Sequence, residues 1–138
     1  MESIEIIELD AKGGPGGWLI AVEQHSDQLP FELKRIYYIY GVAEMVRRGF
    51  HAHKALKQLL ICVSGSCTID IDIGNGRESF VLDRPNKGLF ICRPAWREMY
   101  NFSKDCLLVV CASELYDKDD YIWDFSEFLA FTKSLSLS

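Results

Sequence analysis

The sequence lacks features that are typical of zinc-thiolate, membrane-spanning, secreted and nucleic-acid-binding proteins. None of its five cysteines forms a CxxC pair, which makes a zinc site built from thiolates unexpected. No apolar run approaches the roughly 18 residues of a membrane-spanning helix, and the opening MESIEIIELD lacks the basic-then-apolar layout of a signal peptide. Lys and Arg number 15 against 20 Asp and Glu, and a net charge of −5 excludes a broad basic surface. We therefore expect a cytoplasmic protein with no nucleic-acid and no membrane partner.

The cysteines themselves lie in or beside apolar runs. Free cysteine is among the most buried residue types and behaves as a small hydrophobe. We expect all five to be reduced and buried: Cys62, Cys67, Cys92, Cys106 and Cys111.

What the sequence does contain is a series of short β-type segments in a single domain, residues 1–138. TIDIDI alternates strictly, as expected of a strand with one buried and one solvated face, and the Gly74-Asn75-Gly76 turn follows it. GGPGG (13–17) is expected to be a loop. Many short strands separated by turns favour a sandwich or barrel. The predicted strands are 4–9, 17–23, 34–40, 57–64, 66–73, 77–82, 87–92 and 105–112.

The C-terminal segment departs from this pattern. Asp124 is a suitable helix N-cap, and Phe125, Phe128, Leu129 and Phe131 have the spacing of one apolar helix face. We predict a short helix over about 124–135.

Two of the three histidines stand one residue apart, in RRGFHAHKALKQLLICVSG. In a strand, residues i and i+2 point to the same side, so His51 and His53 project together. Such a pair is half of a metal site or a proton-transfer pair. His25 lies in a polar stretch and needs no function. In RIYYIY, alternation sends Tyr37 and Tyr38 to opposite faces.

The histidine pair resembles the first cupin motif, with Gly49 and Gly65 in the glycine positions and Gln58 in place of glutamate. The second cupin motif appears in degraded form as Cys92, Pro94, Arg97 and Asn101. The resemblance implies an all-β, cupin-type jelly-roll barrel with a short C-terminal helix. Arg97 stands where a third metal-binding histidine is expected.

Arginine has donors but no lone pair, so Arg97 cannot ligate a metal, and its charge would repel a cation. Two imidazoles alone fall short of the three protein ligands of a catalytic site. We therefore expect no metal and no other cofactor. The histidines are then available for acid–base chemistry, and Arg97 suits a phosphate, a carboxylate or an oxyanion.

Longer blocks narrow the resemblance. KRIYYIYG, RRGFHAHKALKQLLICVSGSC and GLFICRPAWREMYNFSKDCLLVVCASELYDKDDYI together are similar to the sugar 3,4-ketoisomerases, over roughly residues 17 to 124. That family implies a metal-free nucleotide-sugar site inside the barrel, acting on dTDP-4-keto-6-deoxyglucose for deoxyamino-sugar biosynthesis of a lipopolysaccharide or S-layer glycan. It also implies a homodimer with exchanged N-terminal strands, and segment 4–9, followed by the GGPGG loop, suits such an exchange. The candidate catalytic residues are His51, His53, Tyr37 and Arg97, and the candidate substrate-binding residues are Arg48, Gln58, Trp96 and Lys54.

The expected reaction moves the keto group of the dTDP-linked sugar from C4 to C3 through an enediolate. The sequence favours His53 as the base at C3, with His51 assisting, and a gluco-configured product. Trp96-Arg97, where many relatives have Trp-His, and the glycines Gly16-Gly17 bear on that configuration. Two alternatives remain open, a metal-free nucleotide-sugar 3,5-epimerase and a non-catalytic sugar-binding cupin.

Overall fold

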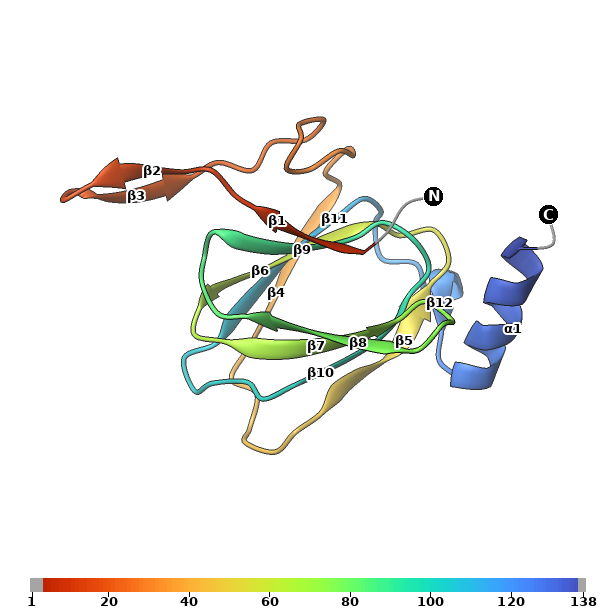
Figure 1. The fold of residues 1–138 in the computed structure, drawn as a ribbon. Coiled ribbons are helices and arrows are strands. Elements are labelled where there is room, and N and C mark those ends of the chain that lie inside the picture. The colour runs from red at the N-terminus through yellow and green to blue at the C-terminus, as the bar shows by residue number, and fades with distance from the viewer. Residues whose placement is uncertain (1–3, 137–138) are drawn as a thin grey trace.

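The structure, a computed structural model, describes residues 4–136. Its main body is a sandwich of two five-stranded antiparallel sheets, which face each other in Figure 1. The first sheet comprises, in spatial order, β1 (Glu5–Glu8), β9 (Lys87–Ile91), β6 (Gln58–Ser64), β11 (Leu107–Ala112) and β4 (Arg35–Tyr40). The second comprises β12 (Tyr121–Ile122), β5 (Arg48–His53), β10 (Trp96–Tyr100), β7 (Cys67–Asp72) and β8 (Arg77–Leu82). The expected all-β fold with a C-terminal helix is confirmed.

Apolar side chains that point inward from both sheets form the main core. Leu60 of β6, Ile69 of β7 and Leu108 of β11 are almost completely buried there. A second apolar layer lies outside the first sheet, where Leu29 and Phe31 of the long connection before β4 cover that sheet. The first sheet is thus buried on both faces over much of its area, which explains why its strands read as continuous apolar runs.

The outer face of the second sheet is charged yet buried, so the expected solvated face of TIDIDI is wrong. Asp70 and Asp72 are only 5% and 7% exposed. Arg47 lies 3.0 Å from Asp70 and 2.9 Å from Glu98, and Arg77 lies 2.9 Å from Glu98. These arginines come from other segments, so alternation within one strand could not reveal that they cover it.

Helix α1 (Phe125–Ser136) begins directly after Asp124, the predicted N-cap. The Asp124 carboxylate accepts the Glu127 backbone N–H at 3.0 Å. Its hydrogen bonds from the Ser126 hydroxyl and then from Glu127 lower the pKa of Asp124. The helix packs beside β5 and β12 (Figure 1). Phe128 is fully buried against Trp96 on the outer face of β10.

The glycine-rich segment forms a hairpin rather than a plain loop. β2 (Ala11–Gly14) pairs with β3 (Gly17–Ile20), so that only Pro15 and Gly16 form the turn. This hairpin is a separate two-stranded sheet that projects from the body (Figure 1). In contrast, β1 pairs with β9 of its own chain. The exchange of strand 4–9 between subunits stays a prediction, and within the single chain β2–β3 is the projecting element.

Four observed strands are absent from the list of predicted strands: β2, β5, β10 and β12. Of these, β5 is expected from the sequence only as the strand that would place the two histidines on one face. β10 has the sequence WREMY, and its charged residues weaken the apolar signal. Arg97 points into the sandwich and Glu98 into the outer ion pairs, so both charges are buried for reasons that lie in other strands.

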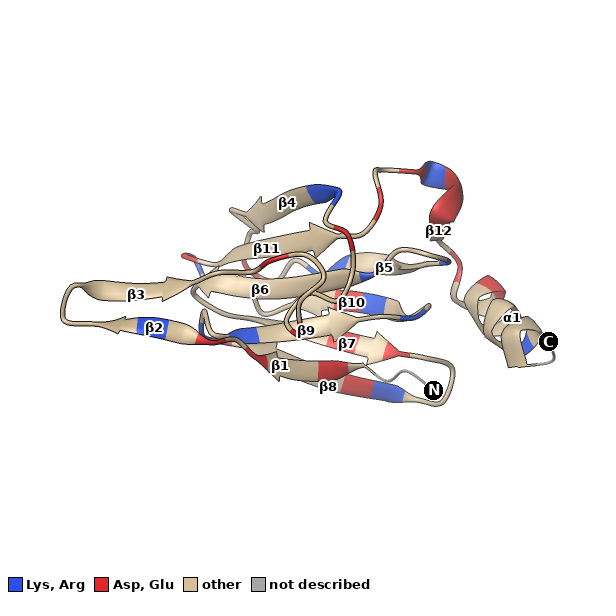
Figure 2. Cartoon of the chain, turned by 90° about the horizontal axis from the view of Figure 1, so that it is seen from above, with Lys and Arg blue, Asp and Glu red and all other residues tan. Residues whose placement is uncertain are grey.

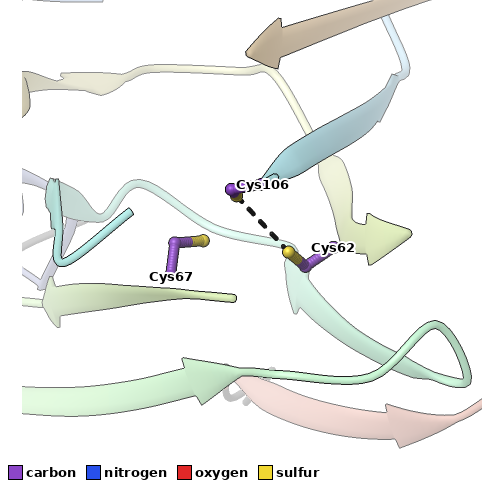
Figure 3. A group of neighbouring side chains, drawn as sticks. All are labelled: Cys62, Cys67 and Cys106. Atoms are coloured by element: carbon purple, nitrogen blue, oxygen red, sulfur yellow. Dashed lines mark hydrogen bonds between the residues drawn. The ribbon is translucent and has the colours of Figure 1, made fainter. Parts of the chain in front are cut away.

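All five cysteines are reduced and buried, as predicted. Three of them gather at one end of the core, as Figure 3 shows, with Cys62 Sγ 3.5 Å from Cys106 Sγ. Their side chains come from β6, β7 and the residue just before β11, so the group lies between the two sheets. Within residues 4–136, no helix has the length and apolar content that crossing a membrane requires.

The packing of α1 generates a stability prediction. Phe128→Ala removes a fully buried ring and should lower the free energy of unfolding by about 3–5 kcal/mol. Leu135→Ala, on the same helix but at a side chain 44% exposed, should cost about 0.5 kcal/mol or less. Equilibrium urea unfolding of both variants measures the difference. Equal losses would show that α1 is not anchored through Phe128.

Candidate active site

The candidate site lies at one end of the sandwich interior, where β5 and β10 run side by side. Alternation along β5 points Gly49, His51 and His53 inward, and His51 pairs directly with Arg97 of β10. Residues directly opposite in an antiparallel pair share a face of the sheet. The register therefore brings the histidine pair and the arginine together inside the fold.

A β-bulge shapes this end of β5. The register shifts between Arg97 and Glu98, and Gly49 has φ +99°. A Cβ at Gly49 would lie 2.9 Å from the Arg97 carbonyl oxygen, so only glycine fits there without a shift. The bulge also turns the Gly49 carbonyl toward His51, whose Nδ1 lies 2.9 Å from it.

That contact defines the state of His51. A carbonyl only accepts, so Nδ1 carries the proton and Nε2 keeps its lone pair. Burial, and then the Arg97 guanidinium, lower the pKa of His51 to about 4. At neutral pH the ring is therefore an uncharged base with one free nitrogen.

His53 has a different partner. Its Nδ1 lies 3.1 Å from Oδ2 of Asp120, and its ring is 4.9 Å from that of His51. The side chain is almost fully buried. Burial, followed by the charges of Arg97, His51 and Arg35, lowers the pKa of His53 as well.

Arg97 is a buried cation. Its side chain donates to the side-chain oxygen of Gln58 and, at 3.2 Å, to the carbonyl of Ala95, while its Nε has no partner. Burial lowers the pKa of Arg97 to about 10, so it stays charged at neutral pH. Among the residues that the structure describes, no carboxylate lies within ion-pair distance of it. A buried, unneutralised cation favours an anion beside it.

Gln58 links this arginine to a tyrosine. The Gln58 amide donates to the hydroxyl oxygen of Tyr37 at 2.8 Å, which leaves the tyrosine proton free to be donated elsewhere. The hydrogen bonds from Arg97 to Gln58 and from Gln58 to Tyr37 thus fix three polar side chains across the two sheets.

Two adjoining pockets open onto the site and share Arg35 and Tyr121. One, of about 340 Å³, holds His51, Tyr37 and Arg48; the other, of about 580 Å³, holds His53 and Asp120. Within residues 4–136, neither Arg35 nor Arg48 has a carboxylate at ion-pair distance, so both cations are available to an anionic ligand.

The segment before α1 supplies an aromatic wall. Tyr121 lies 4.3 Å from the His53 ring and stacks on Trp123 at 4.8 Å with an interplanar angle of 6°. Trp123 also lies 5.2 Å from the ring of His51. Figure 2 shows acidic residues gathered just before β12, where Asp120 stands.

Most of the residues predicted from the sequence meet here: His51, His53, Tyr37, Arg97, Arg48 and Gln58. Tyr37 and Tyr38 point to opposite faces, as alternation predicted, with Tyr37 inward and Tyr38 outward. Trp96 does not join them, because it neighbours Arg97 and so faces outward, where it packs on Phe128 and donates to Glu98. Lys54 is exposed and lines neither pocket.

Sequence reasoning missed Arg35, Asp120, Tyr121 and Trp123. Arg35 had a signal, since alternation in RIYYIY places it on the face of Tyr37. Asp120 is one of three aspartates in DKDD, and only the fold shows which of them meets His53.

The donor set at the histidines does not suit a metal, because Arg97 occupies the place of a third ligand. Among residues 4–136, the one group of three potential ligands is Cys62, Cys67 and Cys106, whose sulfurs lie within 4.8 Å of one another. Cys67 pairs with Leu82, and the register of β7 and β10 puts it at the end of the core away from His51.

Comparison with known proteins gives a consistent result. The family model described as FdtA: WxcM-like, C-terminal, matches residues 2–133. The chain is 41% identical over 121 residues to a TDP-4-oxo-6-deoxy-alpha-D-glucose-3,4-oxoisomerase of Aneurinibacillus thermoaerophilus, covering 88% of this chain and 86% of the relative.

Two solved structures have the same fold. A 3,4-ketoisomerase from Helicobacter canadensis is 46% identical with a TM-score of 0.91, covering 96% of this chain and 99% of that one. A histidine-to-asparagine mutant of the 3,4-ketoisomerase QdtA from Thermoanaerobacterium thermosaccharolyticum, in complex with TDP-4-keto-6-deoxyglucose, is 36% identical with a TM-score of 0.93, covering 100% and 99%. The chain therefore belongs to the FdtA and WxcM-like family of cupin-fold sugar 3,4-ketoisomerases.

Proposed function

We propose that this protein is a sugar-nucleotide 3,4-ketoisomerase that moves the keto group of TDP-4-keto-6-deoxyglucose from C4 to C3. The observation that carries the proposal is the pairing of two neutral histidines with a buried, unneutralised arginine in one pocketed site. Such a site removes a proton next to a ketone and holds the resulting anion. The relatives named above act on, or bind, this sugar nucleotide.

His51 is the base that removes the proton from C3. The sequence favours His53 for this step, but His51 is the more exposed of the two and lines the pocket that also contains Tyr37 and Arg48. Its Nε2 is unprotonated, because Nδ1 is bonded to Gly49. The pKa of about 4 makes it a weak base, and stabilisation of the enediolate supplies the remaining driving force.

Arg97 stabilises that enediolate. Its charge is already desolvated and fixed by Gln58 and Ala95, so little reorganisation is needed when the oxyanion forms. Tyr37, whose oxygen accepts from Gln58, is free to donate its proton and is suited to moving a proton from O3 to O4.

Protonation of C4 completes the reaction, and its face decides the product. In the gluco series, the hydrogens on C3 and C4 lie on opposite faces of the ring, so a gluco product needs a proton donor on the face opposite the base. A galacto product can be formed by one group on one face. Two histidines in two adjoining pockets support the gluco outcome, with His53 as the second proton-transfer group.

The nucleotide requires positive charge and a stacking surface. Arg35 and Arg48 are suited to the diphosphate, since both line a pocket and neither is neutralised within residues 4–136. Tyr121 and Trp123 are suited to contact with a flat ring.

A homodimer is the second part of the proposal. β4 is an edge strand, and its outward side chains Ile36, Tyr38 and Tyr40 are 56%, 63% and 70% exposed. Figure 2 shows β3 and most of β4 without charged residues. An apolar, unpaired edge strand is a site for pairing with another chain. The projecting β2–β3 hairpin, rather than β1, is the element suited to reach a partner.

The activity is tested by product analysis. Purified protein incubated with TDP-4-keto-6-deoxyglucose in EDTA should give the TDP-3-keto sugar in the gluco configuration by NMR, because no step needs a metal. Epimerisation at C3 or C5 with the ketone still at C4 would favour the 3,5-epimerase, and unchanged substrate would favour a sugar-binding protein.

His51→Asn removes the base and keeps a side chain of similar size. kcat should fall by about 100- to 10,000-fold, the usual contribution of general base catalysis. The dissociation constant for TDP, measured by calorimetry, should stay close to that of the unaltered protein. His25→Asn, at an exposed position, is the matched control and should leave both values unchanged. Loss of TDP binding in His51→Asn would make His51 a binding residue.

The pH profile tests the electrostatic role of Arg97. His51 must be neutral to act, so kcat/KM should be level near neutral pH and fall as the pH drops through the His51 pKa of about 4. Arg97→Gln should lower kcat by about 100- to 1,000-fold. It should also move the acid limb to higher pH, because it removes one cause of the lowered His51 pKa. An acid limb at the same pH in Arg97→Gln would contradict the electrostatic coupling between Arg97 and His51. Arg84→Gln, on the exposed surface, serves as the control.

Tyr38→Lys tests the dimer. A lysine in the middle of the outer β4 face should convert dimer to monomer in light scattering after size exclusion, since it would place an unpaired charge in the interface. Lys104→Tyr, at an exposed turn outside β4, should remain dimeric. A monomeric unaltered protein, or a dimeric Tyr38→Lys, would contradict the proposed surface.

A further inference from the structure

We propose that Asp120 is a positioning residue that holds His53 in the form needed to deliver a proton to C4. The inference rests on the proposed ketoisomerase function. It starts from a contact that the histidine motif does not contain: the Asp120 carboxylate reaches His53 from a segment 67 residues farther along the chain.

Asp120 is bound to β5 and the residues just after it at three points. Oδ2 lies 3.1 Å from Nδ1 of His53, and Oδ1 accepts the backbone N–H of Ala55 at 2.8 Å. The carbonyl of Asp120 also accepts the backbone N–H of Lys54 at 2.9 Å. Both carboxylate oxygens are therefore committed, and the side chain has one orientation.

This orientation decides the tautomer of His53. A carboxylate can only accept, so Nδ1 carries the proton and Nε2 is left free for the site. The ring of Tyr121, the next residue, contacts the same imidazole at a centroid distance of 4.3 Å and an interplanar angle of 58°. The imidazole is thus fixed by its hydrogen bond at one edge and by an aromatic contact.

The carboxylate also stabilises the charged ring. The cations near His53 are Arg97 and Arg35, and with His51 they oppose its protonation. Within residues 4–136, Asp120 is the one carboxylate in hydrogen-bond contact with either histidine. When Nε2 takes up a proton, the positive charge is shared with Asp120 rather than left unpaired in the interior.

The proton balance follows from these positions. His51 takes the proton of C3 and the proton of O3 moves to O4. Nε2 of His53 takes up a proton from solvent, with Asp120 sharing the charge, and gives that proton to C4. One C–H bond is broken and one is formed, with no change of oxidation state over the whole sugar. His51 then releases its proton to solvent, so that both histidines are neutral again, and the proton used by His53 enters through the pocket that it shares with Asp120.

Asp120→Asn separates the two proton transfers. The Asn oxygen can still accept from Ala55, which turns the amide NH₂ toward Nδ1 and forces His53 into the opposite tautomer. With substrate in D₂O, formation of the 3-keto product should fall by about 100- to 10,000-fold. Exchange of the C3 hydrogen for deuterium, which needs only His51, should stay within about threefold of the unaltered enzyme.

Asp119→Asn is the matched control, because it removes the same charge from an exposed neighbouring residue and should change neither rate. A parallel loss of exchange, isomerisation and TDP binding in Asp120→Asn would make Asp120 a structural residue and overturn the proposal. Unchanged isomerisation would overturn it as well.

Nitrogen NMR of the unaltered protein gives a second test that needs no variant. His53 should show a protonated Nδ1 and an unprotonated Nε2, and the reverse pattern would overturn the proposal. An unaltered enzyme without turnover would refute the ketoisomerase function itself, while the tautomer would still decide the role of the Asp120 contact.

Discussion

The pairing of β5 with β10 is the constraint on which the rest of the site depends. It sets Arg97 opposite His51, and the bulge at Gly49 turns a carbonyl toward the histidine ring. A register shift of one residue would send Trp96 or Glu98 inward in place of Arg97. Contacts on the outer face disfavour such a shift, because Glu98 accepts a hydrogen bond from Trp96 and forms an ion pair with Arg47 there. Strand β10 therefore contributes to the ionic network with its outer face and to the polar site with its inner face.

The buried charge of Arg97 then sets the chemistry. Together with burial, which is the larger cause, it lowers the pKa of both histidines and keeps them neutral, so that the pair can accept protons near neutral pH. It also leaves a cation in the interior without a carboxylate partner among the described residues, at a cost that an anionic intermediate would offset. The metal-binding form of a cupin site and this form differ at two ligand positions, where Gln58 replaces a glutamate and the fixed charge of Arg97 replaces a histidine.

The two histidines are not equivalent, although the sequence presents them as a pair. His51 has a backbone carbonyl as its partner and lies in the smaller pocket, whereas His53 has a carboxylate and lies in the larger one. A neutral carbonyl suits a group that stays uncharged until it takes a proton, and a carboxylate suits a group that must hold one. This difference is the physical reason for giving them separate roles.

The sequence by itself determined the β-rich fold, the C-terminal helix with Asp124 as its cap, and the common face of His51 and His53, because each depends on local periodicity or capping. It also indicated Tyr37, Arg48, Gln58 and Arg97 through motif positions. Only the tertiary structure decided that Asp70 and Asp72 are buried, that Trp96 packs on α1, and that Asp120 rather than Asp117 or Asp119 meets His53. Those outcomes depend on which distant segments lie together. Periodicity can be recognised in a short stretch of the chain, whereas strand register and long-range contacts cannot.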